Sequence, residues 1–205
     1  MKNFEKINAH FENTLTENGI QPPNELQSSI LKRIRQGGDL LVIAPKGSGK
    51  TYAAIMAILL KCPDSQEGSP RVVYIGSDNN EVLEMTKTLR HLTRRKELMI
   101  EPANDKGKMV EQRVFIFQGA DIVIGNPKRI YDLYIQNGLN MNKLNLLIMD
   151  NPEIFLKDSL IGELNRLSES LPNCQRIFLT EEVNSRTERI IPQFLNHPLI
   201  LEATE

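Results

Sequence analysis

The sequence has no tryptophan, only two cysteines and no excess of charge of either sign. With a formal net charge of −1, the chain as a whole does not attract nucleic acid or a membrane, so any such surface has to be local. Cys62 and Cys174 lie far apart, without histidines beside them, which excludes a cysteine-rich zinc cluster and is typical of free thiols in a reducing compartment. No stretch approaches the roughly 20 apolar residues that cross a bilayer. We therefore expect a cytoplasmic protein without a membrane partner.

Short apolar runs alternate with amphipathic segments along the 205 residues. Apolar runs predict strands at 40–43, 72–75, 122–124, 146–149, 176–179 and 199–201, and the helical period predicts helices at 3–18, 24–36, 50–61, 81–94, 128–136 and 158–171. Continuous apolar strands between helices are typical of a parallel sheet covered on both faces. The pattern predicts one doubly wound α/β domain with a mostly parallel sheet. Segments 63–70 and 101–108, rich in turn formers and charge, are expected to be the least ordered.

A glycine-rich stretch joins the apolar run 40–43 to the helix predicted at 50–61. It consists of Ala44, Pro45, Lys46, Gly47, Ser48, Gly49, Lys50 and Thr51. The two glycines let the backbone curl so that its N–H groups point at phosphate oxygens, and the amino end of the helix adds partial positive charge. Lys50 is expected to reach the β- and γ-phosphates, and the Thr51 hydroxyl to ligate Mg²⁺. The stretch predicts a phosphate-binding loop for a nucleoside triphosphate.

A phosphate-binding loop needs a second acid to hold the metal, at the end of a neighbouring strand. Asp150 directly follows the apolar run 146–149 and meets this requirement. An isolated aspartate there would be an ordinary residue at a strand end. Together with the loop, Asp150 is expected to hold Mg²⁺ through a bound water.

The order of these elements resembles the first RecA-like domain of the DEAD-box RNA helicases, over essentially the whole chain. Residues 19–27 resemble the family's Q motif, which implies that Gln27 reads the adenine edge and that Phe4, upstream, packs near the base. The family's version of the phosphate loop begins with alanine, as this one does at Ala44. Residues 125–129 resemble the family element that contacts the RNA backbone, which implies that Pro127, Lys128 and Arg129 bind nucleic acid.

The resemblance implies a single helicase-type ATP-binding domain over residues 1–205. Residues 1–36 correspond to the N-terminal helices with the Q motif, and residues 37–205 to the RecA-like P-loop core. The implied ligands are ATP or ADP with Mg²⁺. The implied partners are single-stranded RNA and a separate second helicase domain or another protein, because the sequence ends where the first domain of such helicases ends.

Several positions depart from the family pattern. The family's signature tetrad is Asp150-Asn151-Pro152-Glu153 here, so that Asn151 stands where a glutamate helps to activate the attacking water. Asparagine can orient a water but cannot accept its proton, and losing a general base typically costs two to four orders of magnitude in rate. Asp78 replaces an arginine that binds RNA phosphate. The catalytic set implied by the resemblance is therefore Lys50, Asp150 and the altered Asn151.

Three functions remain open from the sequence. The favoured one is an ATP-binding, nucleic-acid-associated domain with weak or no ATPase and helicase activity of its own. The second is a catalytically competent half of an ATP-dependent RNA helicase that needs a second RecA-like domain. The third is a nucleotide-dependent regulatory module that binds RNA or protein. A small phosphotransferase kinase fits badly, because such enzymes need an arginine-bearing lid over the phosphates.

Overall fold

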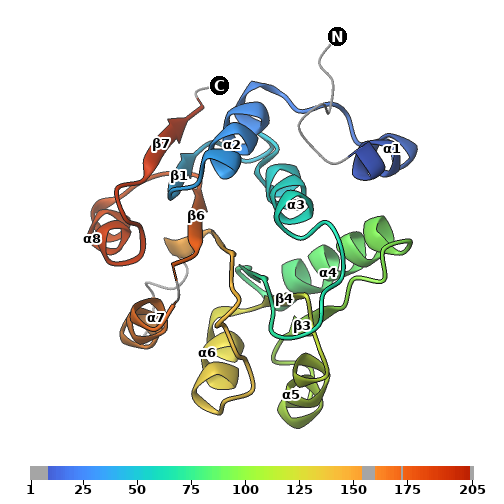
Figure 1. Ribbon diagram of the computed structural model, residues 1–205. Helices are drawn as coiled ribbons and strands as arrows, with labels where there is room; N and C mark the ends of the chain where they lie inside the picture. Colours follow the sequence, from blue (N-terminus) through green and yellow to red (C-terminus); the bar gives the residue numbers. More distant parts are fainter. Residues whose placement is uncertain (1–8, 154–159, 172, 204–205) are drawn as a thin grey trace.

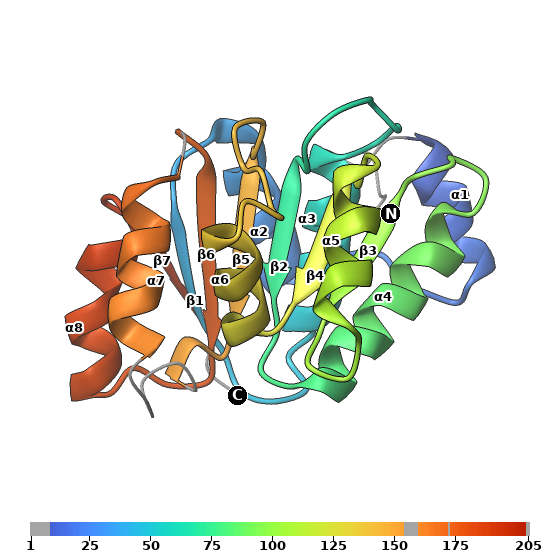
Figure 2. The ribbon, with the colours of Figure 1, turned by 90° about the horizontal axis from the view of Figure 1, so that it is seen from below.

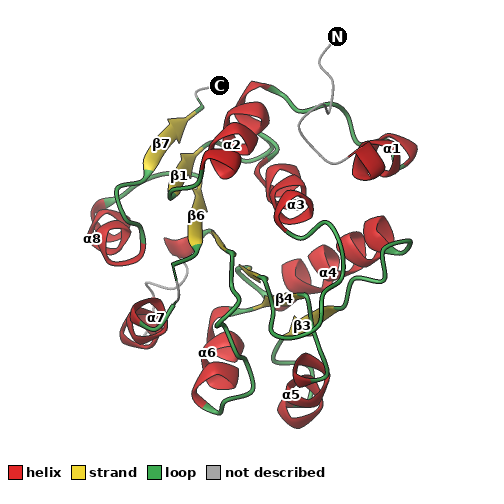
Figure 3. Cartoon of the chain, in the orientation of Figure 1, coloured by secondary structure: helices red, strands yellow, loops and turns green. Residues whose placement is uncertain are grey.

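Seven strands form a single sheet in which every paired strand runs parallel to its neighbour. The computed structural model describes residues 9–153, 160–171 and 173–203. The strands are β1 (Leu40–Ile43), β2 (Val72–Ile75), β3 (Ile100–Ala103), β4 (Ile122–Gly125), β5 (Leu146–Asp150), β6 (Gln175–Thr180) and β7 (Leu199–Glu202). Their order across the sheet is β3-β4-β2-β5-β6-β1-β7. The sheet predicted as mostly parallel is thus parallel throughout the part of the chain that the structure describes. Figure 3 shows strands of the sheet lying between helices.

Helices cover both faces of the sheet (Figure 1). They are α1 (Ala9–Glu17), α2 (Glu25–Gln36), α3 (Lys50–Lys61), α4 (Asn79–Thr93), α5 (Met109–Phe117), α6 (Pro127–Ile135), α7 (Leu160–Glu169) and α8 (Ser185–Phe194). Figure 2 shows α5, α6 and α7 in front of the sheet and α2 and α3 behind it. The doubly wound α/β fold predicted from the sequence is confirmed.

The direction of each crossover explains which face each helix covers. The chain moves toward β3 in its first two connections, through α3 and α4, and toward β7 in every later connection, through α5 to α8. A single handedness for all parallel crossovers requires these two groups to lie on opposite faces. The two buried clusters agree with this requirement, because one contains residues of α1 to α4 and the other residues of α5 to α8.

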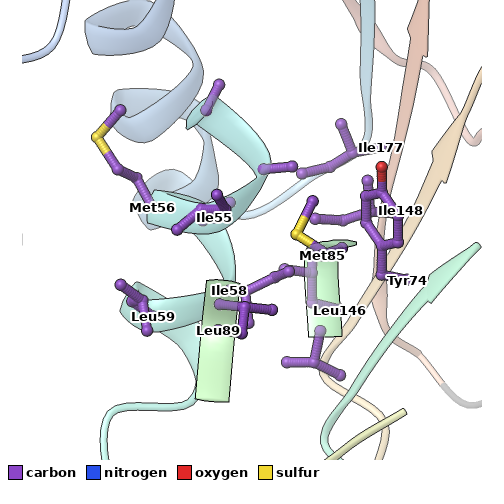
Figure 4. Close-up of a cluster of buried hydrophobic side chains, with 14 of the residues drawn as sticks. Ile55, Met56, Ile58, Leu59, Tyr74, Met85, Leu89, Leu146, Ile148 and Ile177 are labelled. Atoms are coloured by element: carbon purple, nitrogen blue, oxygen red, sulfur yellow. The ribbon is translucent and has the colours of Figure 1, made fainter. Parts of the chain in front are cut away.

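Each face of the sheet has its own apolar core. On the α1–α4 face, side chains of α3 and α4 pack against alternate residues of the central strands, among them Tyr74, Leu146 and Ile148 (Figure 4). On the opposite face, Val73, Leu147 and Phe178 pack against α6, α7 and α8. Because successive strand residues point to opposite faces, each strand contributes to both clusters. This explains why the strands are apolar without alternation.

Between residues 94 and 122 the structure differs from the prediction. Residues 100–103 form the edge strand β3, which pairs with β4, and α5 follows it. Residues 101–103, part of the segment 101–108 that was expected to be among the least ordered, instead belong to this strand. β3 carries Glu101 and Pro102, and proline is tolerated in an edge strand because one side of that strand makes no ladder bonds.

A buried ion pair joins the amino ends of β2 and β4. The Asp121 carboxylate, 1% exposed, lies 2.6 Å from the Arg71 guanidinium. It also accepts hydrogen bonds from the Ser65 hydroxyl and the Gln66 N–H, each at 2.9 Å, and from the Met99 N–H at 3.0 Å. The segment 63–70, expected to be among the least ordered, is thus hydrogen-bonded to the sheet through one carboxylate.

Among the described residues, no helix has both the length and the apolar character required to span a bilayer.

Candidate nucleotide-binding site

The glycine-rich loop runs from the carboxyl end of β1 to the first turn of α3. Gly47 has φ +86° and Gly49 has φ +94°, in the left-handed region that residues with a side chain rarely adopt. A Cβ atom on Gly49 would also lie 2.3 Å from the Gln27 side-chain nitrogen. The backbone conformation therefore requires glycine at this position, and a side chain there would displace the Gln27 amide.

Lys50 lies within the loop, with 8% of its surface exposed. Its ammonium nitrogen donates to the backbone oxygens of Ala44, at 2.5 Å, and Pro45, at 3.0 Å. The charge is thus held where the loop closes on itself, and a bound phosphate would have to exchange with these carbonyls. Thr51, the next residue, is exposed and lines the same pocket.

The start of α2 is hydrogen-bonded to the same loop. Asn24 and Gln27 form a capping box, in which the Asn24 side chain accepts from the Gln27 N–H at 2.8 Å and Gln27 Oε1 accepts from the Asn24 N–H at 3.0 Å. Gln27 Nε2 donates to the Gly49 oxygen and Asn24 Nδ2 to the Ser48 oxygen, both at 3.1 Å. The structure thus places Gln27 beside the loop, as the sequence predicts; its contact with adenine stays a prediction.

Asp150 ends β5, next to the loop, and is 3% exposed. Its Oδ2 accepts from the Tyr74 hydroxyl at 2.9 Å, and the same hydroxyl lies 2.5 Å from Glu81 Oε1. Burial, followed by repulsion from the Glu81 carboxylate, raises the pKa of Asp150 to about 7, although Lys50 opposes this shift. Burial, with the two neighbouring carboxylates, also raises the pKa of Tyr74 well above its ordinary value.

These residues line one open pocket of about 340 Å³. It is lined by Lys46, Gly47, Gly49, Lys50, Thr51, Tyr52, Glu81, Asp150, Asn151 and Glu181. The loop, Asp150 and Asn151, which lie about a hundred residues apart in sequence, are therefore brought together. Asn151 has φ +50°, a left-handed conformation that asparagine tolerates better than most residues.

The pocket has the donor atoms that Mg²⁺ requires. Asp150 Oδ1 is buried and accepts no hydrogen bond from the described residues. A carboxylate oxygen and the Thr51 hydroxyl are hard oxygen ligands, which Mg²⁺ prefers. The described residues contain no group of three or more acidic, histidine or cysteine side chains that could hold a metal without help. The set therefore fits an ion that is held jointly by protein and nucleotide phosphates.

A second contact joins the ends of β5 and β6. The Thr180 hydroxyl lies 3.1 Å from Glu153 Oε2 and 2.8 Å from the Glu182 backbone oxygen. None of the motifs identified in the sequence predicts this contact. A threonine–carboxylate link next to the pocket is nevertheless present.

The residues predicted to bind nucleic acid lie at the carboxyl end of β4. Asn126 caps α6 by accepting from the Arg129 N–H at 2.9 Å, and Pro127 occupies the first turn. Lys128 is exposed, whereas the Arg129 side chain is 12% exposed and its guanidinium lies 3.6 Å from the Asp105 carboxylate. Lys128 is thus free to meet a ligand, and Arg129 would have to leave an ion pair to do so.

Two residues of the pocket region were missed by reasoning from sequence. Glu81 and Tyr74 belong to α4 and β2, and their meeting with Asp150 is a contact between elements that no local spacing predicts. One predicted residue cannot be placed, since Phe4 lies outside the described residues.

The fold and the pocket together define a RecA-like α/β domain with a glycine loop at the carboxyl edge of a parallel sheet. The family model "DEAD/DEAH box helicase" matches residues 24–184. The chain therefore belongs to the DEAD/DEAH box helicase family, as the resemblance in its motifs implied.

Curated relatives share about a quarter of the residues. The pre-mRNA-processing ATP-dependent RNA helicase PRP5 of Meyerozyma guilliermondii is 25% identical over 193 residues, which cover 90% of this chain and 22% of that protein. The ATP-dependent RNA helicase DeaD of Haemophilus influenzae is 25% identical over 189 residues, 88% of this chain and 30% of that protein. The chain thus spans less than a third of the length of either relative.

Solved structures show the same fold. A DEAD box protein from Methanococcus jannaschii has a TM-score of 0.88 and 16% identity, covering 98% of this chain and 56% of that one. A structure of S. cerevisiae Dbp5 bound to Nup159, Gle1, IP6 and ADP has a TM-score of 0.83 and 13% identity, covering 97% of this chain and 53% of that one. At these identities the likeness establishes the RecA-like fold.

Replacing Asp150 by asparagine is expected to stabilise the ligand-free domain at neutral pH. The pKa of the Asp150 carboxyl is raised from an ordinary value of 3.8 to about 7 in the folded chain, so the folded chain binds this proton more tightly than the unfolded chain. The free energy of unfolding contributed by Asp150 therefore falls as the pH rises between these values. The difference in unfolding free energy between Asp150→Asn and the unmodified chain should therefore grow by about 2 kcal/mol, in favour of the variant, between pH 5 and pH 8.

Urea unfolding at the two pH values, without nucleotide or Mg²⁺, measures this difference. Glu84→Gln, which removes an exposed carboxylate from α4, serves as the control and should show no such growth. The prediction is contradicted if the difference in unfolding free energy between Asp150→Asn and the unmodified chain is the same at pH 5 and pH 8.

Proposed function

We propose that this domain binds adenine nucleotide with Mg²⁺ in the pocket between the loop 44–51 and Asp150. The single observation that carries the proposal is the buried Asp150 Oδ1, which has no hydrogen-bond partner among the described residues in a pocket that also contains Lys50 and Thr51. When bound, Mg²⁺ would supply positive charge that neutralises the nucleotide phosphates. Asp150 and Thr51 would hold it, and Lys50 would bind the phosphates. The presence of ADP in the Dbp5 structure supports the choice of nucleotide.

Adenine selectivity is attributed to Gln27. Its amide makes two hydrogen bonds, to the Asn24 N–H and the Gly49 oxygen, and keeps one N–H and one lone pair for the edge of a base. Glycine at position 49 allows this amide to lie against the loop. The side chain that would read the base is therefore hydrogen-bonded to the backbone of the loop that would bind the phosphates.

ATP turnover by this chain is proposed to be slow. Asn151 offers no base for the attacking water, and its left-handed backbone does not favour a glutamate in its place. The names of the relatives support a role in RNA remodelling, and the exposed Lys128 is proposed as an RNA contact. A second RecA-like domain or another protein partner is proposed to complete the RNA-binding surface. We also propose a cytoplasmic location, which the two free, buried thiols support because free thiols are typical of a reducing compartment.

Titration calorimetry with ADP, GDP and ATP in the presence of MgCl₂ tests the function. ADP is expected to bind at least tenfold more tightly than GDP, and Gln27→Ala to remove most of that preference. ATP recovered by chromatography after the titration is expected to be largely intact, with or without RNA. Absence of ADP binding at millimolar concentration would refute nucleotide binding, and rapid loss of ATP would refute slow turnover.

A further inference from the structure

We propose that Glu81 is a second acidic residue of the metal site, a positioning residue that acts on Mg²⁺ through the Tyr74 hydroxyl and Asp150. This inference rests on the proposed function, since it concerns the metal that accompanies the nucleotide. It assigns a role in the metal site to a residue for which the sequence implied none.

The Tyr74 hydroxyl connects the two carboxylates. The Tyr74 ring is fully buried, in the same apolar cluster as Met85 and Ile148 (Figure 4). Its hydroxyl lies 2.5 Å from Glu81 Oε1 and 2.9 Å from Asp150 Oδ2. A buried tyrosine needs a partner for its hydroxyl, and here it has two. The ring is thus a rigid support that fixes the separation of Glu81 and Asp150.

Glu81 is held firmly from its other side. Its Oε2 accepts from the Ser77 N–H at 2.7 Å and from the Ser77 hydroxyl at 2.6 Å. Asp78 caps α4 independently, by accepting from the N–H groups of Asn80 and Glu81. The capping of the helix therefore does not require Glu81 to reach toward Asp150.

The hydrogen bonds that the Glu81 and Asp150 carboxylates accept do not balance their negative charge. The single proton of the Tyr74 hydroxyl can be donated to only one carboxylate at a time. Lys50 attracts Asp150, but its ammonium group is hydrogen-bonded to the carbonyls of Ala44 and Pro45. A buried Asp150 carboxylate with one unpartnered oxygen, beside the half-buried Glu81 carboxylate, is well compensated by a divalent cation.

Partners behind a metal ligand orient it and adjust its basicity, and their loss typically lowers metal affinity about 10- to 100-fold. Tyr74 is such a partner of Asp150 through its hydroxyl, and Glu81 is one through Tyr74. Their removal should therefore weaken the contribution of Mg²⁺ to nucleotide binding, and leave metal-free binding almost unchanged.

The experiment compares ADP affinity by calorimetry in saturating MgCl₂ and in EDTA, at pH 8, above the pKa of about 7 of Asp150. The measured quantity is the ratio of the two affinities. In Glu81→Gln and in Tyr74→Phe this ratio is expected to fall about tenfold. Glu84→Gln removes the same charge from an exposed position on α4 and should keep the ratio of the unmodified chain. Thermal unfolding of each variant is measured alongside.

The outcomes separate the two proposals. A Glu81→Gln variant with an unchanged ratio overturns the role of Glu81, and a loss of thermal stability with an unchanged ratio assigns Glu81 to the support of α4 alone. In both cases ADP still binds and the proposed function stands. If the unmodified chain binds no ADP in either buffer, both the proposed nucleotide binding and the proposed role of Glu81 are refuted.

Discussion

Replacement of Lys50 by alanine is expected to weaken binding of ADP with Mg²⁺ by about 100-fold, or about 3 kcal/mol. Charge-assisted hydrogen bonds to phosphate contribute roughly 1.5–3 kcal/mol each. In the ligand-free chain, however, the ammonium group already donates to the Ala44 and Pro45 carbonyls. Binding therefore exchanges one set of acceptors for another, and the loss is smaller than the sum of the phosphate bonds.

Calorimetry with ADP measures the change, with Lys87→Ala, an exposed lysine on α4, as the control for the loss of one positive charge. The Lys50→Ala variant should remain folded, because removing the two hydrogen bonds, of roughly 1.5–3 kcal/mol each, also removes the cost of burying the ammonium charge. Equal weakening in both variants would show that general electrostatic attraction, and not the position of Lys50, holds the phosphates.

Replacement of Asp121 by alanine is expected to destabilise the domain by about 3–5 kcal/mol. The carboxylate is fully buried and compensates the Arg71 guanidinium, whose side chain is only 7% exposed. Without it, a buried positive charge is left without its counter-ion, and the N–H groups of Gln66 and Met99 lose their acceptor. The segment 63–70 should then separate from the sheet.

Urea unfolding gives the free energy, and limited proteolysis shows whether cleavage moves to 63–70. The double variant Arg71→Met/Asp121→Ala removes both charges, and should recover part of the lost stability because no unpaired charge remains. A loss below about 1 kcal/mol in the single variant would mean that water reaches Arg71 and that the pair contributes little.

The central elements could be predicted because their sequence signals are local. β1, β2, β4 and β5 are continuous apolar runs, which the burial of both sheet faces requires. The glycine loop and Asp150 follow two of these runs directly, so their meeting at one edge of the sheet follows from strand direction alone. The loop, Asp150 and Asn151 were therefore identified before their positions were known.

Three other elements, α5, α8 and β3, have no such local signal. α5 exposes Val110 at 74% and Phe117 at 85%, so its apolar residues do not follow one face and no helical period stands out. α8 contains Pro192, which argues against a helix from sequence alone although a helix forms there. β3 needs only one paired neighbour, so half-polar residues are sufficient.

For the site, the contact of Glu81 and Tyr74 with Asp150 could not be predicted from the sequence. Their contact depends on the distance between β2, β5 and α4, which tertiary packing sets. A glutamate near the start of a helix predicts only favourable capping. Charges that meet across elements become visible in the structure alone.

The hydrogen bonds from α2 to the loop have a consequence for how occupancy of the pocket can be detected. Gln27 and Asn24 donate to the carbonyls of Gly49 and Ser48, so any ligand that rotates those peptide groups also disturbs the first turn of α2. Such coupling is reciprocal, so loosening that turn must change nucleotide affinity by the same factor. Amide exchange at the amino end of α2 should thus serve as a spectroscopic reporter of a ligand bound more than twenty residues further along the chain.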